Sequence, residues 1–288
     1  MTLPTYEELS RPLPLTHPKR WYYGVLKRVL RAAAPLSRGL STGFEHGFDS
    51  GVMLEHVYRN TPEGRGVLGK AIDRVYLNSP GWQGIRARGE LVKSALSAAL
   101  HAQAQASGPI RMLDVACGGG RYDLEVLQSW QQRGGRPVQA TLRDYMQVNV
   151  DSARALGAEL GVTGVTFERA DAFNDDDLAR AVQGGPLDIA LVSGLHEILS
   201  DDALIERHFQ QLGRIVRPGG TLIYTLQPQH PQVELIARAL PSHTGDLWVM
   251  RLRSAELIEG WAKAGGFSTT ARWTEPQGIF GVVLARRA

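Results

Sequence analysis

The sequence has a single cysteine, no long hydrophobic run and little excess of charge. Because Cys117 has no second cysteine to pair with, an internal disulfide is excluded and the fold must rest on packing, which suits a reducing compartment. No run of about 18 apolar residues occurs, so a membrane span is not expected. The N-terminus, MTLPTYEELS, lacks the basic cap and apolar stretch of a secretory signal. We therefore expect a soluble, cytoplasmic protein.

The charge balance also limits the partners to be expected. The formal net charge is only +3 over 288 residues, with 43% hydrophobic and 21% charged residues, which is an ordinary globular composition. A nucleic-acid footprint needs clustered Lys and Arg, so nucleic acid is not an expected partner. The His residues and the one cysteine do not fall at zinc-binding spacings, and no metal is expected. Nothing in the composition decides whether the chain forms a homo-oligomer.

The pattern of the chain divides it at residues 106 and 107. Residues 1–106 have helical periodicity, and Ser79 followed by Pro80 marks the start of a helix. Helices are expected in this part near 21–33, 50–60, 65–77 and 82–105. In 107–288 strands are expected at 110–116, 138–144, 165–171, 187–193, 221–227, 267–275 and 278–287. Helices are expected between them near 121–133, 147–160, 174–183 and 202–216. This order predicts an α/β fold, a parallel sheet with helices on both faces, whose last two strands form an antiparallel hairpin.

The most informative segment is RMLDVACGGGRYDLEVL, residues 111–127. A buried strand ends at Asp114 and Val115, and small residues then lead into a helix. Residues with little side chain let a ligand lie against the backbone at the carboxyl end of a strand, and the following helix offers unpaired N–H groups. A glycine-rich turn can also be purely structural. The spacing differs from the G-x-G-x-x-G of nicotinamide-binding domains.

The next two expected strands also end in carboxylates. Asp144 closes the second strand, where it could accept both hydroxyls of a ribose. Asp171 follows the third strand, where it could meet an adenine amino group, and Phe173 could flank the ring. Taken singly, Asp144 and Asp171 could be helix caps. Three consecutive strand ends of this kind favour a nucleoside ligand.

These motifs resemble those of class I S-adenosylmethionine-dependent methyltransferases, over residues 109–288. LDVACGGG is similar to the family's first motif, VRPGGTLIYT resembles its turn into the fifth strand, and the final hairpin resembles its reversed seventh strand. The resemblance implies a Rossmann-like, mostly parallel seven-stranded sheet and S-adenosyl-L-methionine as cofactor. FDSGVMLEHVYRN and YLNSPGWQGIR also resemble an uncharacterised group of bacterial methyltransferases. The cofactor-binding residues implied are Asp114, Ala116, Cys117, Gly118, Gly120, Asp144, Tyr145, Asp171, Ala172, Phe173 and Ser193.

The fourth strand leads into Ser193, His196 and Glu197, where the resemblance places the methyl acceptor. His196 could act as a general base, since the unperturbed pKa of histidine is about 6.5. Glu197 could orient His196 or cap the next helix. His196 could instead only pack at the end of the loop.

Residues 1–106 are expected to form a helical lid over the cofactor. Arg86 is the expected partner of the methionine carboxylate, with Arg88 as the alternative and an exposed basic helix face as the structural explanation. The expected acceptor-binding residues are Tyr76, Trp82, Trp248 and Arg251, although aromatic residues of this kind also occur in ordinary cores.

The segment 19–38 carries six basic residues, no acidic residue, and three adjacent aromatics at Trp21, Tyr22 and Tyr23. A basic amphipathic helix can lie on an anionic membrane surface. It can also pack on its own domain. On the first interpretation, the acceptor would be a lipid or another amphiphile.

The expected function is methyl transfer from S-adenosylmethionine to a small molecule. An alternative is attack at the aminocarboxypropyl carbon of the cofactor, including ring closure to a cyclic amino acid, with release of methylthioadenosine. A third interpretation is a protein that senses the cofactor without turnover. Methyl transfer itself depends mainly on alignment and exclusion of water, so no single side chain in the sequence decides between them.

Overall fold

The computed structural model describes residues 3–105 and 107–288, which form two compact units. The helical unit consists of Met1–Ala87, Gln229–Leu252 and Pro276–Ile279, and the sheet unit of Arg88–Pro228, Arg253–Glu275 and Phe280–Ala288. These units are defined by contacts, whereas the predicted division into 1–106 and 107–288 follows the change of sequence pattern and stays a prediction.

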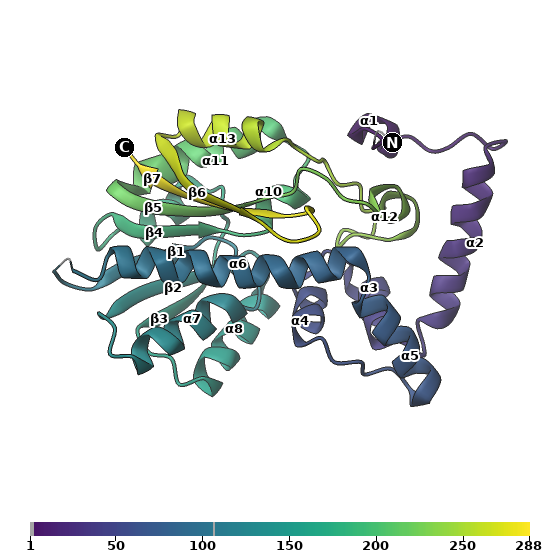
Figure 1. Ribbon diagram of the computed structural model, residues 1–288, viewed down its shortest axis with the longest axis horizontal. Helices are drawn as coiled ribbons and strands as arrows, with labels where there is room; N and C mark the ends of the chain where they lie inside the picture. The colour runs from purple at the N-terminus through teal and green to yellow at the C-terminus, as the bar shows by residue number, and fades with distance from the viewer. Residues whose placement is uncertain (1–2, 106) are drawn as a thin grey trace. The chain divides into compact units, whose positions relative to one another are not determined.

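The sheet unit contains one seven-stranded sheet (Figure 1). Its strands are β1 (Ile110–Asp114), β2 (Val138–Asp144), β3 (Val165–Arg169), β4 (Leu187–Val192), β5 (Val216–Leu226), β6 (Phe267–Thr274) and β7 (Gly281–Arg287). They lie in the order β3-β2-β1-β4-β5-β7-β6, with the first five parallel and β7 antiparallel to both of its neighbours. The predicted fold, a mostly parallel sheet with an antiparallel C-terminal hairpin, is confirmed. The hairpin is antiparallel because the short link between β6 and β7 cannot make a parallel crossover.

Helices connect the strands and cover the sheet. They are α6 (Pro80–Ala102, which begins in the helical unit), α7 (Arg121–Gln132), α8 (Gln147–Glu159), α9 (Asp175–Ala181), α10 (Leu195–Ile198), α11 (Asp202–Ile215) and α13 (Ala255–Ala264). Figure 1 shows α7 and α8 near β2 and β3, and α11 and α13 near the β5–β7 side. Every residue of β4 is buried, as expected of a central parallel strand covered on both faces.

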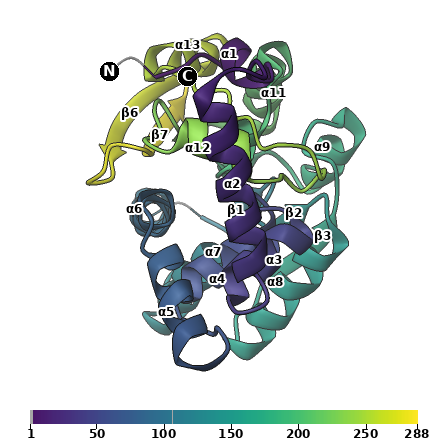
Figure 2. The same ribbon diagram turned by 90° about the vertical axis from the view of Figure 1, so that its right-hand side faces the viewer.

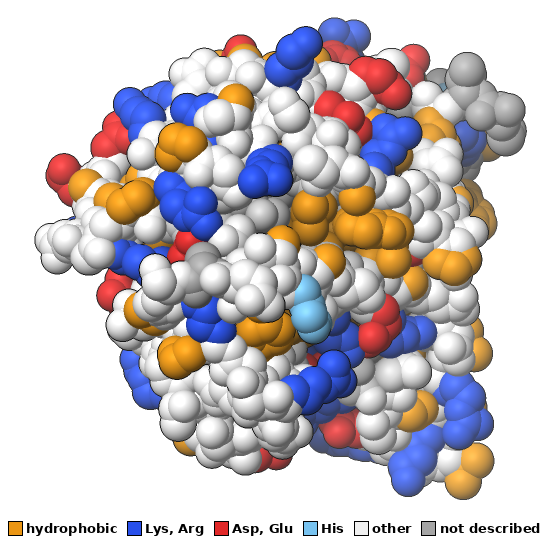
Figure 3. Space-filling view, turned by 60° about the vertical axis from the view of Figure 1, so that its left-hand side comes forward, with side chains coloured by type: hydrophobic (Ala, Val, Ile, Leu, Met, Phe, Trp, Pro, Cys, Tyr) orange, Lys and Arg blue, Asp and Glu red, His pale blue; other side chains and the backbone are white. Residues whose placement is uncertain are grey.

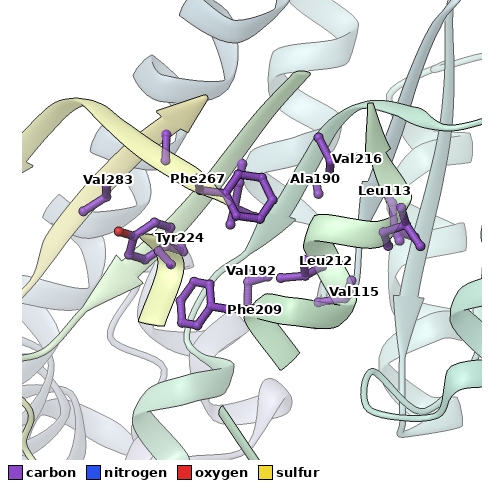
Figure 4. Close-up of a cluster of buried hydrophobic side chains, with 14 of the residues drawn as sticks. Leu113, Val115, Ala190, Val192, Phe209, Leu212, Val216, Tyr224, Phe267 and Val283 are labelled. Atoms are coloured by element: carbon purple, nitrogen blue, oxygen red, sulfur yellow. The ribbon is translucent and has the colours of Figure 1, made fainter. Parts of the chain in front are cut away.

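A hydrophobic cluster lies between the sheet and the helices α11 and α13 (Figure 4). Leu113, Ala190 and Tyr224 come from the strands, and Phe209 and Leu212 come from α11. All five are fully buried. This packing fixes the carboxyl ends of β1 and β4, from which the loops of the candidate site start.

The helical unit contains α1 (Tyr6–Ser10), α2 (Pro18–Ala33), α3 (Arg38–His46), α4 (Gly51–Arg59), α5 (Gly66–Leu77), the start of α6, and α12 (Val233–Ala239). The buried carboxylate of Asp73 organises part of it: it accepts hydrogen bonds from Ser37 Oγ at 2.5 Å and from the backbone N–H groups of Gly39 and Glu63 at 2.9 Å. The four helices predicted in residues 1–106 are confirmed, and α6 begins at Pro80 as its start signal predicts.

Among the residues that the structure describes, five helices were not predicted: α1, α3, α10, α12 and α13. Two of them, α1 and α10, have five and four residues, too few to show a periodicity. Glycines interrupt the pattern of α3 and α13, since glycine is a poor helix former. Their helical form therefore depends on capping and tertiary packing, such as the bond from Leu40 N–H to Ser37 Oγ.

Candidate functional site

The loop after β1 is held in a tight turn by its own backbone. Cys117 N–H donates to the carbonyl of Arg143 at 2.7 Å, and Gly120 N–H donates to the carbonyl of Cys117 at 2.9 Å. Gly118 and Gly120 have φ values of +56° and +65°, in the left-handed region that favours glycine. A Cβ on Gly120 would press against Ala153 and Leu142, whereas a Cβ on Gly118 would meet no atom within 4 Å. Gly118 therefore presents bare backbone to open space, as a close-lying ligand requires.

The predicted carboxylates follow the strands in a stepwise register. Asp114 of β1 lies beside Leu142, so Asp144 is two residues further along β2. Asp144 lies beside Arg169, so Asp171 is two residues beyond that position. Because side chains repeat every two residues along a strand, Asp144 is on the same face of the sheet as Asp114. The sheet thus brings the predicted ligand-binding ends of β1, β2 and β3 to one edge.

Asp144 fastens the glycine loop to β2. Its Oδ2 accepts from Gly118 N–H at 3.0 Å, and its Oδ1 accepts from Met146 N–H and Asn149 Nδ2, both at 2.9 Å. A carboxylate offers about four acceptor positions, so one remains for a ligand hydroxyl. The neighbouring Tyr145 is 63% exposed, with the guanidinium of Arg169 5.8 Å from its ring centroid.

The segment after β3 is shaped by Asp171. Its Oδ1 accepts from Phe173 N–H at 2.9 Å, and its own N–H donates to Asp177 Oδ2 at 2.7 Å. This turn holds Ala172 and Phe173 in place. The Phe173 ring packs against the imidazole of His208, with the ring centroids 4.7 Å apart.

Asp114 and Asp123 lie at the two ends of the glycine loop, and neither exposes any surface. Their carboxyls are hydrogen-bonded to each other, and Asp114 Oδ1 also accepts from Ala116 N–H at 2.9 Å. Burial raises the pKa of Asp114 to about 7 and raises that of Asp123 well above its usual range, with the neighbouring carboxylate charges adding to the effect. Within the described residues, no other donor reaches Asp114 Oδ2 or either oxygen of Asp123, so the pair must hold a proton between them.

Cys117 is buried beside this pair. Burial, followed by the charges of Asp114, Asp123 and Asp144, raises the pKa of its thiol well above the ordinary value. The thiol therefore stays protonated, and Cys117 contributes size and backbone conformation to the loop rather than a nucleophile.

The end of β4 carries two buried polar side chains. Ser193 Oγ and both carboxylate oxygens of Glu197 are buried and receive no hydrogen bond from the described residues. Gly194 between them has φ +80°, and its N–H donates to Thr225 Oγ1 at 2.9 Å. Since burying an unpaired carboxylate is costly, Glu197 is suited to receive a donor from a ligand.

His196 points to a different environment from Glu197. Its Nε2 lies 2.9 Å from His208 Nδ1, and Arg253 Nη1 donates to its carbonyl at 3.1 Å. Burial, then the charges of His208 and Arg253, lowers the pKa of His196 well below 6.5, and burial lowers that of His208 to about 3. Both imidazoles are neutral at neutral pH. The role of His196 as a general base stays a prediction.

The two candidate arginines of α6 belong to different units. Arg86 is in the helical unit, where its Nη1 donates to the carbonyl of Leu77 at 2.9 Å. Arg88 is in the sheet unit and 3% exposed, and its guanidinium lies over the Phe280 ring, 5.0 Å from the centroid. Its Nη2 is 3.3 Å from where a Cβ on Gly194 would stand. Arg88, which the sequence analysis gave as the alternative to Arg86, is thus the arginine that lies at the end of β4.

The predicted acceptor-binding residues all lie in the helical unit. Tyr76 and Trp82 are brought together, with ring centroids 5.8 Å apart, and Tyr76 Oη donates to Met53 Sδ at 3.5 Å. Trp248 is partly buried, and Arg251 Nη1 lies 3.4 Å from Glu7. Their contact with an acceptor stays a prediction.

Sequence reasoning missed Asp123 and His208. Each is a polar residue in a helical segment, a place where polar residues usually face water. The signal available for Asp123 was its position in the first turn of the helix that follows the glycine loop. Among the described residues, no group of three or more His, Cys, Asp or Glu side chains is placed to hold a metal ion.

Comparison with known proteins matches residues 1–287 to a family model described as "Putative methyltransferase". The chain is 38% identical over 284 residues to the uncharacterised protein YnbC of Escherichia coli strain K12. That alignment covers 96% of this chain but 46% of YnbC, so the chain spans about half the length of its relative.

Two solved structures share the fold. A protein from Bordetella parapertussis, described as a possible exported protein, has a TM-score of 0.63 at 18% identity, over 96% of this chain and 99% of that one. Magnesium protoporphyrin IX methyltransferase from Synechocystis PCC 6803, with bound SAH, has a TM-score of 0.58 at 14% identity, over 84% of this chain and 97% of that one. At these identities the likeness shows the fold alone.

Proposed function

The chain belongs to the methyltransferase family that its residues 1–287 match, and from that membership we propose that it transfers a methyl group from S-adenosylmethionine to a small-molecule acceptor. The observation that carries the proposal is the edge of the sheet where β1, β2 and β3 end. Open backbone at Gly118 stands there among the carboxyls of Asp114, Asp144 and Asp171.

The residues at this edge fit the parts of the cofactor. Asp144 has an acceptor position left for a ribose hydroxyl, and the turn of Asp171 places Phe173 to flank the adenine. Asp114 Oδ2, buried without a donor from outside its pair, suits the methionine ammonium. Arg88 is the better-placed arginine for the methionine carboxylate, because it lies beside Gly194 in the same unit. When bound, the cofactor supplies a methyl group activated by its sulfonium.

On the acceptor side, we assign the leading role to Glu197. Its buried carboxylate can accept a hydrogen bond from an acceptor hydroxyl or amine and take up the proton that methylation displaces. Ser193 Oγ can hold the same group in line with the methyl. His196, bonded to His208, positions the loop that carries Glu197.

Several features support a small acceptor rather than a nucleic acid. The net charge is +3, and basic and acidic side chains are interspersed over the face shown in Figure 3. Nucleic-acid binding needs a concentrated basic surface. The single cysteine supports a reducing location such as the cytoplasm. Since the chain spans about half of YnbC, these proposals concern the reaction of this chain.

The test is mass spectrometry of the products formed by the purified protein. Incubation with S-adenosylmethionine and a small-molecule fraction of a cell extract should yield S-adenosylhomocysteine, and omission of the fraction should abolish it. Methylthioadenosine formed without any acceptor would replace the proposal with aminocarboxypropyl transfer or ring closure. Cofactor binding without either product in any fraction would favour a sensor. The Gly118→Ala variant is the negative control, because its Cβ enters the space left for the ligand.

A further inference from the structure

Helix α2 exposes an apolar surface to solvent. Trp21 is 70% exposed, Tyr22 60%, Val25 54% and Val29 56%, and no residue of the helix is fully buried. Exposed apolar residues are ordinary when scattered, but a contiguous group marks a binding surface. These four residues form such a group because successive residues of a helix are about 100° apart around its axis. On that spacing all four fall within about 100° of arc.

The opposite side of α2 is occupied by packing within the helical unit. Lys19 Nζ lies 2.7 Å from Glu234 Oε2 of α12, and the Tyr23 hydroxyl also bonds to the Glu234 carboxylate. Leu26 and Leu30, on the same side as Tyr23, are partly buried. Figure 2 shows α2 crossing in front of α12, and at this crossing no other element of the helical unit lies between α2 and the viewer. The contacts with α12 therefore fix which face of α2 points outward.

Basic side chains border the apolar surface along one flank. The helix contains no acidic residue. Arg20, Arg28 and Arg31 project on the flank away from Leu26, beside the surface formed by Trp21, Tyr22, Val25 and Val29. Arg28 is adjacent to Trp21 around the helix axis and is exposed. An apolar strip with such a border complements a surface that is apolar inside and negatively charged at its rim.

We propose that α2 docks the protein on an anionic lipid surface. Trp21, Val25 and Val29 enter the boundary between headgroups and acyl chains, while Arg20, Arg28 and Arg31 contact lipid phosphates. Trp21 and Tyr22 are residue types that prefer this boundary, where one end of the ring is apolar and the other is wet. The helix lies in the plane of the surface, since within residues 3–105 and 107–288 no helix is long and apolar enough to cross a membrane. The proposal does not depend on the reaction proposed above.

The experiment is co-sedimentation of the full chain with lipid vesicles. Vesicles containing about one third phosphatidylglycerol should bind the protein, and vesicles of phosphatidylcholine alone should bind it at least about tenfold less. Raising the salt to about 0.5 M should weaken binding, because the electrostatic part is screened. The double variant Trp21→Ala, Val25→Ser should lose at least about tenfold in vesicle affinity.

A matched variant separates this surface from exposed apolar residues in general. Val67 and Val75 of α5 are 89% and 76% exposed, so Val67→Ser, Val75→Ser removes similar apolar area elsewhere and should bind vesicles normally. Circular dichroism and cofactor affinity should be the same in all three proteins. Equal vesicle binding by the Trp21 variant and the wild type would overturn the proposal. So would a dimer in sedimentation velocity that dissociates in the Trp21 variant, since a second copy would then cover the face.

Discussion

Asp114 and Asp123 are joined by a hydrogen bond although neither exposes any surface, so the pair keeps a proton that two isolated aspartates would have lost at neutral pH. A carboxyl whose pKa is raised by folding contributes stability that is fully present below its unfolded pKa, about 3.9, and is lost as the pH rises through the folded value. For this pair, the free energy of unfolding therefore falls as the pH rises through about 7, the pKa of Asp114, and it falls further because the pKa of Asp123 is also raised. The slope is at most about 1.4 kcal/mol per pH unit for each proton released.

Asp123→Asn should therefore flatten the alkaline side of the stability curve. The amide can still donate to Asp114 but does not titrate. We expect the free energy of unfolding to fall between about pH 6 and 8 in the wild type and to change less in the variant. Urea denaturation at several pH values measures this. Parallel curves for the two proteins would show that the pair does not share a proton.

Gly118→Ala should weaken cofactor binding in addition to its cost to the fold. The substitution places a side chain at φ +56°, which costs about 1–2 kcal/mol, and puts the new methyl into the open space beside the loop. We expect at least about a tenfold loss of affinity for S-adenosylmethionine in calorimetry. Gly134→Ala is the control, since Gly134 has φ +70° and an equally open Cβ position at the other end of α7. Equal affinities in both variants would remove Gly118 from the binding surface.

Glu197→Gln should stabilise the free protein while lowering methyl transfer. The wild-type carboxylate is buried without a donor from the described residues, and a neutral amide costs less to bury, by about 1 kcal/mol or more. Thermal unfolding measures the gain, and S-adenosylhomocysteine formation with the active acceptor fraction measures the loss. Exposed Glu159→Gln should change neither. An unchanged turnover would exclude Glu197 from the reaction.

Arg88→Gln should discriminate between two ligands. S-adenosylmethionine has a carboxylate for Arg88 to bind, whereas methylthioadenosine lacks the amino acid part. We expect the variant to lose affinity for the first by about tenfold or more and to keep its affinity for the second. Arg86→Gln is the matched comparison, since Arg86 donates to the Leu77 carbonyl. If the Arg86 variant instead lost affinity for S-adenosylmethionine alone, Arg86 and not Arg88 would be the partner of the methionine carboxylate.

His208→Gln should make the protein less sensitive to acid. Folding depresses the pKa of His208 from 6.5 to about 3, so its contribution is present above about pH 6.5 and is lost as the pH falls toward 3. The difference in unfolding free energy between wild type and variant should therefore shrink from pH 6.5 to about 4. A gap that stays the same at every pH would mean that folding does not lower the pKa of His208.

The strands and the carboxylates at their ends were predictable because both depend on local sequence patterns. The strand before Asp114 is an apolar run that stops at small residues, and Asp144 closes the next apolar run in the same way. A parallel sheet then brings such ends to one edge whatever the rest of the chain does. The same reasoning identified the hairpin, because two strands joined by a few residues can pair only in the antiparallel sense.

The burial of Asp123, His208 and Arg88 was not predictable in this way. A polar residue in a helix usually faces water, and only the tertiary packing shows that His208 points at His196. The assignment of residues 229–252 to the helical unit could not be predicted from the sequence either. It depends on long-range hydrogen bonds, such as those from Phe48 N–H to the Pro241 carbonyl and from Arg238 Nη1 to the Leu9 carbonyl, both at 3.0 Å.

The assignment of 229–252 to the helical unit has a consequence for inheritance and engineering. The backbone passes from one unit to the other at 87/88, 228/229, 252/253, 275/276 and 279/280, so neither unit is a continuous stretch of gene. A fragment that starts at residue 107 would carry α12 without the α2 residue Lys19 that pairs with Glu234. The helical unit therefore cannot be exchanged between relatives as one cassette, and recombination within this family should preserve its three segments together.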